Sequence, residues 1–149
     1  MKRQTLRYVL VFCLLASAAF TAWTWLRPYA WAPDPRARGE VVSVLVTQDQ
    51  AYFWVNVHWK ANSGPPHNLQ KKVCLETSHG VKLDTADTTL VGSNEKVITE
   101  IWWKFWLNSE DLDGFLTLHV NDGSLSIKSE SGIPDLGKSN YRNFTTNQW

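Results

Sequence analysis

The chain has 149 residues, 44% of them apolar and 19% charged, and its formal net charge is +1. This length gives a domain of ordinary size and excludes a large multidomain enzyme. The small net charge excludes a nucleic-acid-binding protein that relies on a strongly basic surface. The net charge is close to zero because a basic part and an acidic part of the chain offset each other. Residues 1–38 carry six basic and one acidic side chain, and residues 39–149 carry nine basic and 13 acidic ones.

The N-terminal part contains an uncharged apolar run from Tyr8 to Leu26, which follows the basic residues 1–7. Its 19 residues, rising about 1.5 Å each in a helix, span the hydrocarbon thickness of a bilayer. We therefore expect a transmembrane signal-anchor helix over 8–26. The basic flank predicts a cytoplasmic N-terminus and an extracytoplasmic C-terminal part, periplasmic or extracellular. Rings that suit the headgroup boundary follow at the far end of the run: Trp23, Trp25, Tyr29 and Trp31.

A cleaved signal peptide is the alternative interpretation of this segment. The small residues 16–18 resemble a cleavage site, and cutting after Ala18 would give a secreted protein. The remaining apolar residues 19–26 would then form an exposed N-terminus, so we favour the uncleaved anchor. The following segment, 27–38, contains three prolines and is expected to be a stiff spacer.

From Gly39 the apolar period changes to two, which is typical of strands. Val42, Val44 and Val46 alternate with more polar neighbours, and the runs 52–60 and 96–107 each have one apolar and one mixed face. Turn residues separate these runs from shorter ones up to Lys128. The pattern predicts an all-β domain over 39–131, an antiparallel immunoglobulin-like β-sandwich of about seven or eight strands, followed by an irregular C-terminal tail over 132–149.

The resemblance to immunoglobulin-like domains is generic. No pair of cysteines joins the two expected sheets, and no tyrosine of the tyrosine-corner type precedes the late strand.

No catalytic or metal-binding motif is visible in the sequence. The four histidines show no ligand spacing, although His58 and His119 would be neighbours if their strands were adjacent. Cys13 lies in the apolar run and Cys74 in an expected strand, so a disulfide between them is not expected. We therefore expect a non-enzymatic protein without a cofactor, and keep a small metal-delivery or redox protein using Cys74 and histidines as an alternative.

The nine tryptophans are the most informative feature. The alternation places Trp59 and Trp103 on inner faces and four other rings on outer faces, next to polar residues. We expect these rings, with the terminal tryptophan, to form an aromatic interaction surface: Tyr52, Trp54, Trp102, Trp106 and Trp149.

Three interpretations of this surface remain open. Other segments of the chain cover it, a partner protein binds it, or sugar rings stack on it with Asn56 and Glu100 holding hydroxyls. We favour an accessory, assembly or interaction subunit of a membrane protein complex. Its partners would be the lipid bilayer and other integral membrane subunits. A carbohydrate or cell-envelope ligand-binding module is the alternative.

Overall fold

The structure is a computed structural model that describes residues 2–26, 34–94 and 97–149. The chain forms two compact units, an N-terminal helix and a larger β-rich unit. The helix, α1 (Lys2–Leu26), includes a segment from Arg3 to Thr24 that is long and apolar enough to cross a membrane, a property that a signal sequence shares.

Hydroxyl groups inside α1 are satisfied by the helix itself. Ser17 donates its Oγ hydrogen to the Cys13 carbonyl at 2.8 Å, and Thr21 does the same to the Ser17 carbonyl at 2.8 Å. This pairing lets a helix carry polar side chains where no water is available. Of the four rings expected at the headgroup boundary, Trp23 is exposed; Tyr29, Trp31 and the side chain of Trp25 lie outside the described residues.

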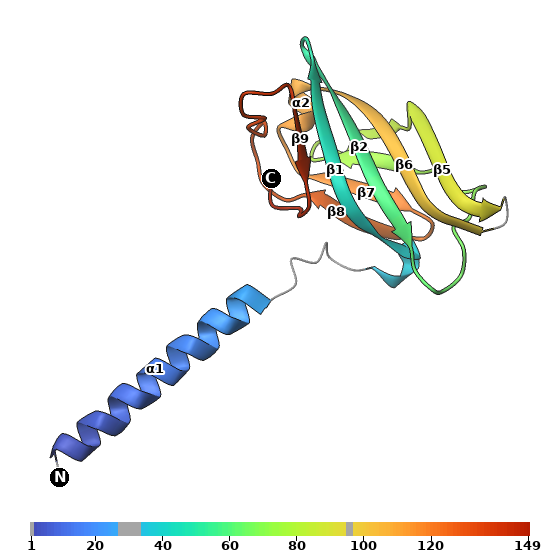
Figure 1. The fold of residues 1–149 in the computed structure, drawn as a ribbon. Helices are drawn as coiled ribbons and strands as arrows, with labels where there is room; N and C mark the ends of the chain where they lie inside the picture. Colours follow the sequence, from blue (N-terminus) through green and yellow to red (C-terminus); the bar gives the residue numbers. More distant parts are fainter. Residues whose placement is uncertain (1, 27–33, 95–96) are drawn as a thin grey trace. The chain divides into compact units, whose positions relative to one another are not determined.

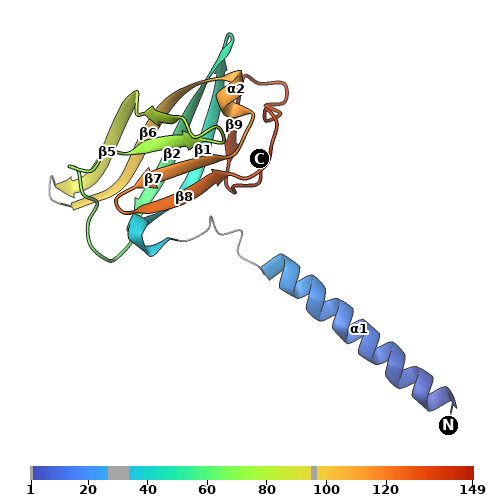
Figure 2. The same ribbon diagram turned by 180° about the vertical axis from the view of Figure 1, so that it is seen from behind.

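The β-rich unit consists of two antiparallel sheets, with nine strands in the described part of the chain (Figures 1 and 2). The five-stranded sheet has the order β5 (Asp87–Asn94), β6 (Val97–Asn108), β2 (Tyr52–Ala61), β1 (Gly39–Asp49) and β9 (Tyr141–Phe144). The four-stranded sheet has the order β4 (Lys82–Asp84), β3 (Cys74–Thr77), β7 (Leu116–Val120) and β8 (Gly123–Lys128). A 3₁₀ turn, η1 (Pro35–Ala37), precedes β1, and a short helix, α2 (Ser109–Leu112), follows β6.

The core follows from the alternation along β2 and β6. Register pairs Phe53 with Leu107 and Trp59 with Ile101, so the apolar sides of both strands face the same way. The predicted inner positions from 53 to 59 and from 101 to 107 are buried, Trp59 and Trp103 among them. Side chains of the second sheet complete one shared hydrophobic cluster: Leu75, Leu116, Leu118, Val120, Leu125 and Ile127.

The first strand departs from the predicted alternation. A register shift lies between Val41 and Ser43 in the pairing of β1 with β2. Because a bulge adds a residue to one strand, it moves the following side chains to the other face. Val41 is therefore buried and Val42 exposed, and the expectation that Val42 shares the face of Val44 was wrong.

The segment before β1, expected to be spacer, already belongs to the β-rich unit. The Asp34 carboxylate accepts hydrogen bonds from the backbone N–H groups of Arg36 and Ser124, both at 3.0 Å. The Arg36 guanidinium, the Ser124 amide and the Arg36 amide together lower the pKa of Asp34 to about 2. These contacts fix η1 against β8.

The C-terminal segment contains a strand instead of being irregular throughout. β9 pairs with β1 from Val44 opposite Phe144 to Thr47 opposite Tyr141, and so extends the five-stranded sheet at one edge (Figure 1). Four residues are too few to show a clear alternation. Only the polar composition of the segment was therefore informative, and it indicated a loop.

Candidate interaction surface

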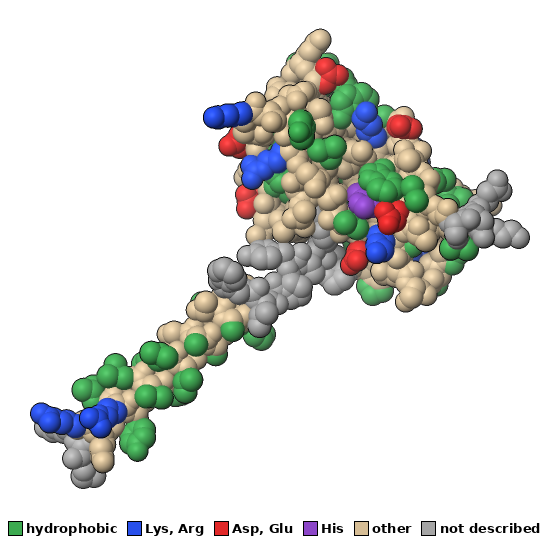
Figure 3. Space-filling model, in the orientation of Figure 1, with side chains coloured by type: hydrophobic (Ala, Val, Ile, Leu, Met, Phe, Trp, Pro, Cys, Tyr) green, Lys and Arg blue, Asp and Glu red, His purple; other side chains and the backbone are tan. Residues whose placement is uncertain are grey.

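The outer face of the five-stranded sheet carries the rings that alternation had placed outside. Partners in an antiparallel ladder project to the same side. Trp54 lies opposite Trp106, and His58 lies opposite Trp102. Figure 3 shows the resulting mixture of hydrophobic, acidic, basic and histidine side chains on the face that Figure 1 presents.

Three rings form a contact cluster on this face. Tyr52 stacks on Trp106 with ring centroids 4.9 Å apart, and Trp54 meets Trp106 edge-on at 4.2 Å. Tyr52 is 44% and Trp106 36% exposed, while Trp54 is partly buried beneath the Lys104 ammonium, 4.3 Å from its ring centroid. The rings hold one another in fixed orientations and still present apolar area to solvent, as preorganised contact residues do.

The cluster extends further than the sequence indicated. Thr47 of β1 pairs with Trp54 on one side and with Tyr141 of β9 on the other. Tyr141, which is 57% exposed, therefore joins Trp54 and Trp106 in a row across four strands. Alternation could not place Tyr141 on this face, because its strand is only four residues long. We call the outer-face residues Tyr52, Trp54, Trp102, Trp106 and Tyr141 the aromatic face.

One face of the Trp102 ring is covered by the neighbouring His58 ring. The His58 ring stacks on it at 4.1 Å with an interplanar angle of 7°, and the His58 Nε2 lies 2.8 Å from a Glu100 carboxylate oxygen. The His58–Glu100 pair is only partly exposed. One face of Trp102 is consequently closed to a ligand that would stack on it.

The two polar groups expected to hold sugar hydroxyls are poorly disposed for that role. Asn56 Oδ1 is buried without a hydrogen-bond partner in the described part of the chain. Glu100 has one oxygen engaged by His58. Together with the covered face of Trp102, this arrangement leaves few free polar groups beside an open ring face.

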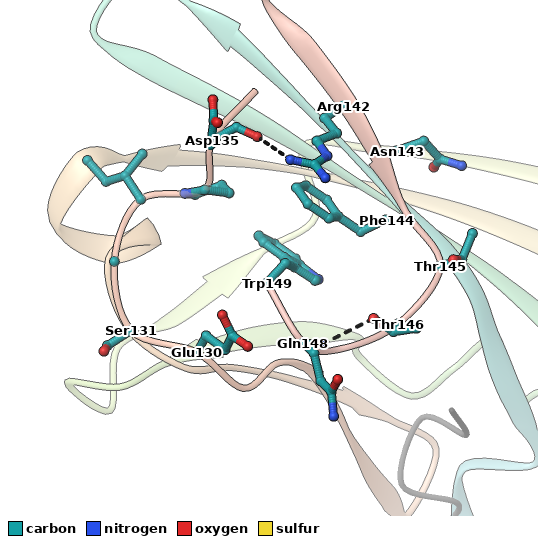
Figure 4. A pocket seen from close by; sticks show the side chains of 13 residues that line it. Glu130, Ser131, Asp135, Arg142, Asn143, Phe144, Thr145, Thr146, Gln148 and Trp149 are labelled. Atoms are coloured by element: carbon teal, nitrogen blue, oxygen red, sulfur yellow. Dashed lines mark hydrogen bonds between the residues drawn. The ribbon is translucent and has the colours of Figure 1, made fainter. Parts of the chain in front are cut away.

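The structure does not bring Trp149 to the aromatic face. It is 6% exposed, belongs to the core and stacks on Phe144 with ring centroids 4.6 Å apart. In Figure 4 the two rings lie against each other, with the Arg142 guanidinium carbon 5.2 Å from the Phe144 centroid. They line an open cavity of about 440 Å³ bounded mainly by polar side chains. Trp149 thus anchors the C-terminal segment to the core instead of contributing to an exposed surface.

Cys74 and His119 are opposed partners in the pairing of β3 with β7, but the other histidine of interest, His58, lies in the other sheet. His58 lies in the five-stranded sheet and His119 in the four-stranded one, so their strands are not adjacent. His119 Nε2 is 2.6 Å from a Glu76 oxygen. Cys13 and Cys74 are both free thiols. Among the described residues, no three His, Cys, Asp or Glu side chains are arranged to hold a metal ion.

Comparisons with protein-family models, with curated proteins and with solved structures find no match for this chain.

Proposed function

We propose that this chain is a single-pass membrane protein without enzymatic activity, whose β-rich unit binds another integral membrane protein through the aromatic face. It would act as an accessory, assembly or interaction subunit of a membrane complex. The observation that carries the proposal is the row of Tyr141, Trp54 and Trp106 across four strands of one sheet.

The composition of the face supports a protein partner. Tyr and Trp dominate the contacts that contribute most to protein association, because they offer large rigid area at low entropic cost. Lys104 over Trp54 and the His58–Glu100 pair place charged groups between the rings, as expected of an interface that must remain soluble when free.

The membrane assignment is supported by the helix. α1 has the required length and composition, and residues 2–7 carry the basic charge that favours a cytoplasmic N-terminus. The β-rich unit would then be extracytoplasmic. We also propose that the two sheets form an immunoglobulin-like β-sandwich, supported by the single core to which both contribute.

The test is recovery of a partner from native membranes after mild solubilisation and chemical cross-linking. Trp106→Ala removes a ring in contact with both Tyr52 and Trp54. Truncation of such a central ring costs 2 kcal/mol or more at an interface, about a 30-fold loss of affinity. Phe115→Ala is the matched control, because Phe115 is an aromatic residue, 55% exposed, that lies outside the aromatic face.

We expect Trp106→Ala to abolish the cross-linked species and Phe115→Ala to retain it. Equal recovery with both variants would contradict the proposal. Binding to immobilised cell-envelope glycans that Trp106→Ala abolishes, with no cross-linked protein, would replace it with the carbohydrate-binding alternative.

A further inference from the structure

The two sheets have four edges, and three of them are blunted. β4 has three residues with Lys82 and Asp84 at its ends. β8 is bound by η1 through the Ser124 amide and the Asp34 carboxylate. β9 has four residues, among them Arg142, which donates to the Asp135 carbonyl at 2.8 Å. Short strands, edge charges and covering segments are the usual protection against unwanted strand pairing.

Apart from the charge of Asp87 at its start and the register shifts beyond Val91, the fourth edge, β5, has none of these protections. It is eight residues long, no described strand lies beyond it, and its central stretch 88–91 contains no charge and no proline (Figure 1). The Thr88 backbone N–H bonds to the neighbouring Asp87 carboxylate at 2.8 Å instead of to a strand. Register shifts begin after Val91, so the regular part of the edge is 87–91.

A hollow of about 280 Å³ lies beside this edge. It is lined by Thr88 and Leu90 of β5, by apolar side chains of the neighbouring segments and by charged ones: Leu69, Val73, Trp103, Lys71, Lys72 and Asp84. Leu90 is 47% exposed and Leu69 is also exposed. The edge thus combines an exposed leucine with a recess whose lining is partly apolar and partly charged.

We propose that β5 pairs with β5 of a second copy of this chain, antiparallel and about a two-fold axis at Thr89. This register places Thr88 of one copy opposite Leu90 of the other. The projecting leucine of each copy then lies beside the recess that Thr88 lines in the other. An interface in which the same strand supplies both the projection and the recess is self-complementary, which is what a two-fold dimer requires.

The dimer goes beyond the proposed function and does not compete with it. Pairing uses the edge of the five-stranded sheet, whereas the aromatic face uses its surface. Two sheets would become one continuous sheet, and anchoring both copies in one membrane would raise their effective concentration.

Disulfide cross-linking of the full chain in detergent micelles tests the register. In a background of Cys13→Ala and Cys74→Ser, Thr89→Cys places the two thiols across the proposed axis. Directly opposed residues of antiparallel strands have Cα atoms about 4.5–5.5 Å apart, within the range that a disulfide spans. Asn143→Cys is the matched control, an exposed position on the opposite edge of the same sheet.

We expect Thr89→Cys to form a covalent dimer under mild oxidation at least tenfold faster than Asn143→Cys, and Leu90→Lys added to Thr89→Cys to remove this advantage. Light scattering should give a dimer mass for the wild-type protein and a monomer mass for Leu90→Lys. Equal cross-linking rates at the two positions, or a monomeric wild-type protein, would overturn the proposal. Trp106→Ala should leave the cross-linking rate unchanged, so failure of the partner experiment and failure of the dimer are distinguishable.

Discussion

Neighbouring positions on β6 provide a direct test of the inside–outside assignment on which the aromatic face depends. Phe105 is fully buried and belongs to the core shared by both sheets, whereas Trp106 projects outward against Tyr52 and Trp54. Phe105→Ala should destabilise the β-rich unit by about 3–5 kcal/mol, because it removes a fully buried ring and leaves a cavity.

The larger side chain at position 106 should matter less for stability. Trp106→Ala removes two aromatic contacts, each worth about 0.5–1.5 kcal/mol, from a ring that is already partly hydrated. We expect the loss of these two contacts to cost about 1–3 kcal/mol. For a unit of this size, about 4 °C of melting temperature corresponds to 1 kcal/mol, so the Phe105→Ala and Trp106→Ala variants should melt about 12–20 °C and about 4–12 °C below the wild-type protein.

Near-ultraviolet circular dichroism of the full chain in mild detergent, followed during heating, measures both shifts. A Trp106→Ala loss equal to or greater than that of Phe105→Ala would refute the assignment of faces. It would mean that Trp106 supports the fold and offers little surface to a partner.

Two further predictions concern titratable groups. The Arg36 guanidinium is the main cause that lowers the pKa of Asp34 to about 2. The carboxylate therefore stabilises the fold fully above pH 3.8, the ordinary pKa of the group, and this contribution is lost as pH falls through about 2. The amide resonance of Ser124 should titrate with a midpoint near pH 2, and Asp34→Asn should abolish that transition. Burial lowers the pKa of Lys128, partly offset by the carboxylates of Asp113 and Glu130, so the unfolded chain binds more protons there and stability should rise with pH toward 10.5. Urea unfolding between pH 7 and 10 should show a smaller increase for Lys128→Met than for the wild-type protein, and equal slopes would contradict the assignment.

The elements that the sequence predicted correctly are those with long, regular patterns. The apolar run behind a basic start predicted α1, and the alternation predicted which side chains are buried in β2 and, from Ile101 onward, in β6. At the start of β6 the prediction was wrong, because Val97 and Thr99 are exposed and Ile98 packs against the core. Burial of every second residue is a local consequence of the pleat, so it can be inferred without knowing the neighbouring strands.

The features that could not be predicted depend on distant parts of the chain. The exposure of Val42 follows from a bulge in the ladder between β1 and β2, which exists only once both strands are paired. The burial of Trp149 requires Phe144 to stack on it and Lys128 to lie 5.7 Å from its ring. Tyr141 reaches the aromatic face only because β9 adds to β1.

The pairing of β9 with β1 also determines the order in which the sheet can be completed. Val44 and Phe144 are partners although roughly 100 residues separate them along the chain. Contacts between segments so far apart form slowly, because a long loop must close first. A chain emerging from the ribosome would therefore carry β1 with one side unpaired until residues 141–144 had been made, and an unpaired strand edge of this kind favours aggregation in the meantime.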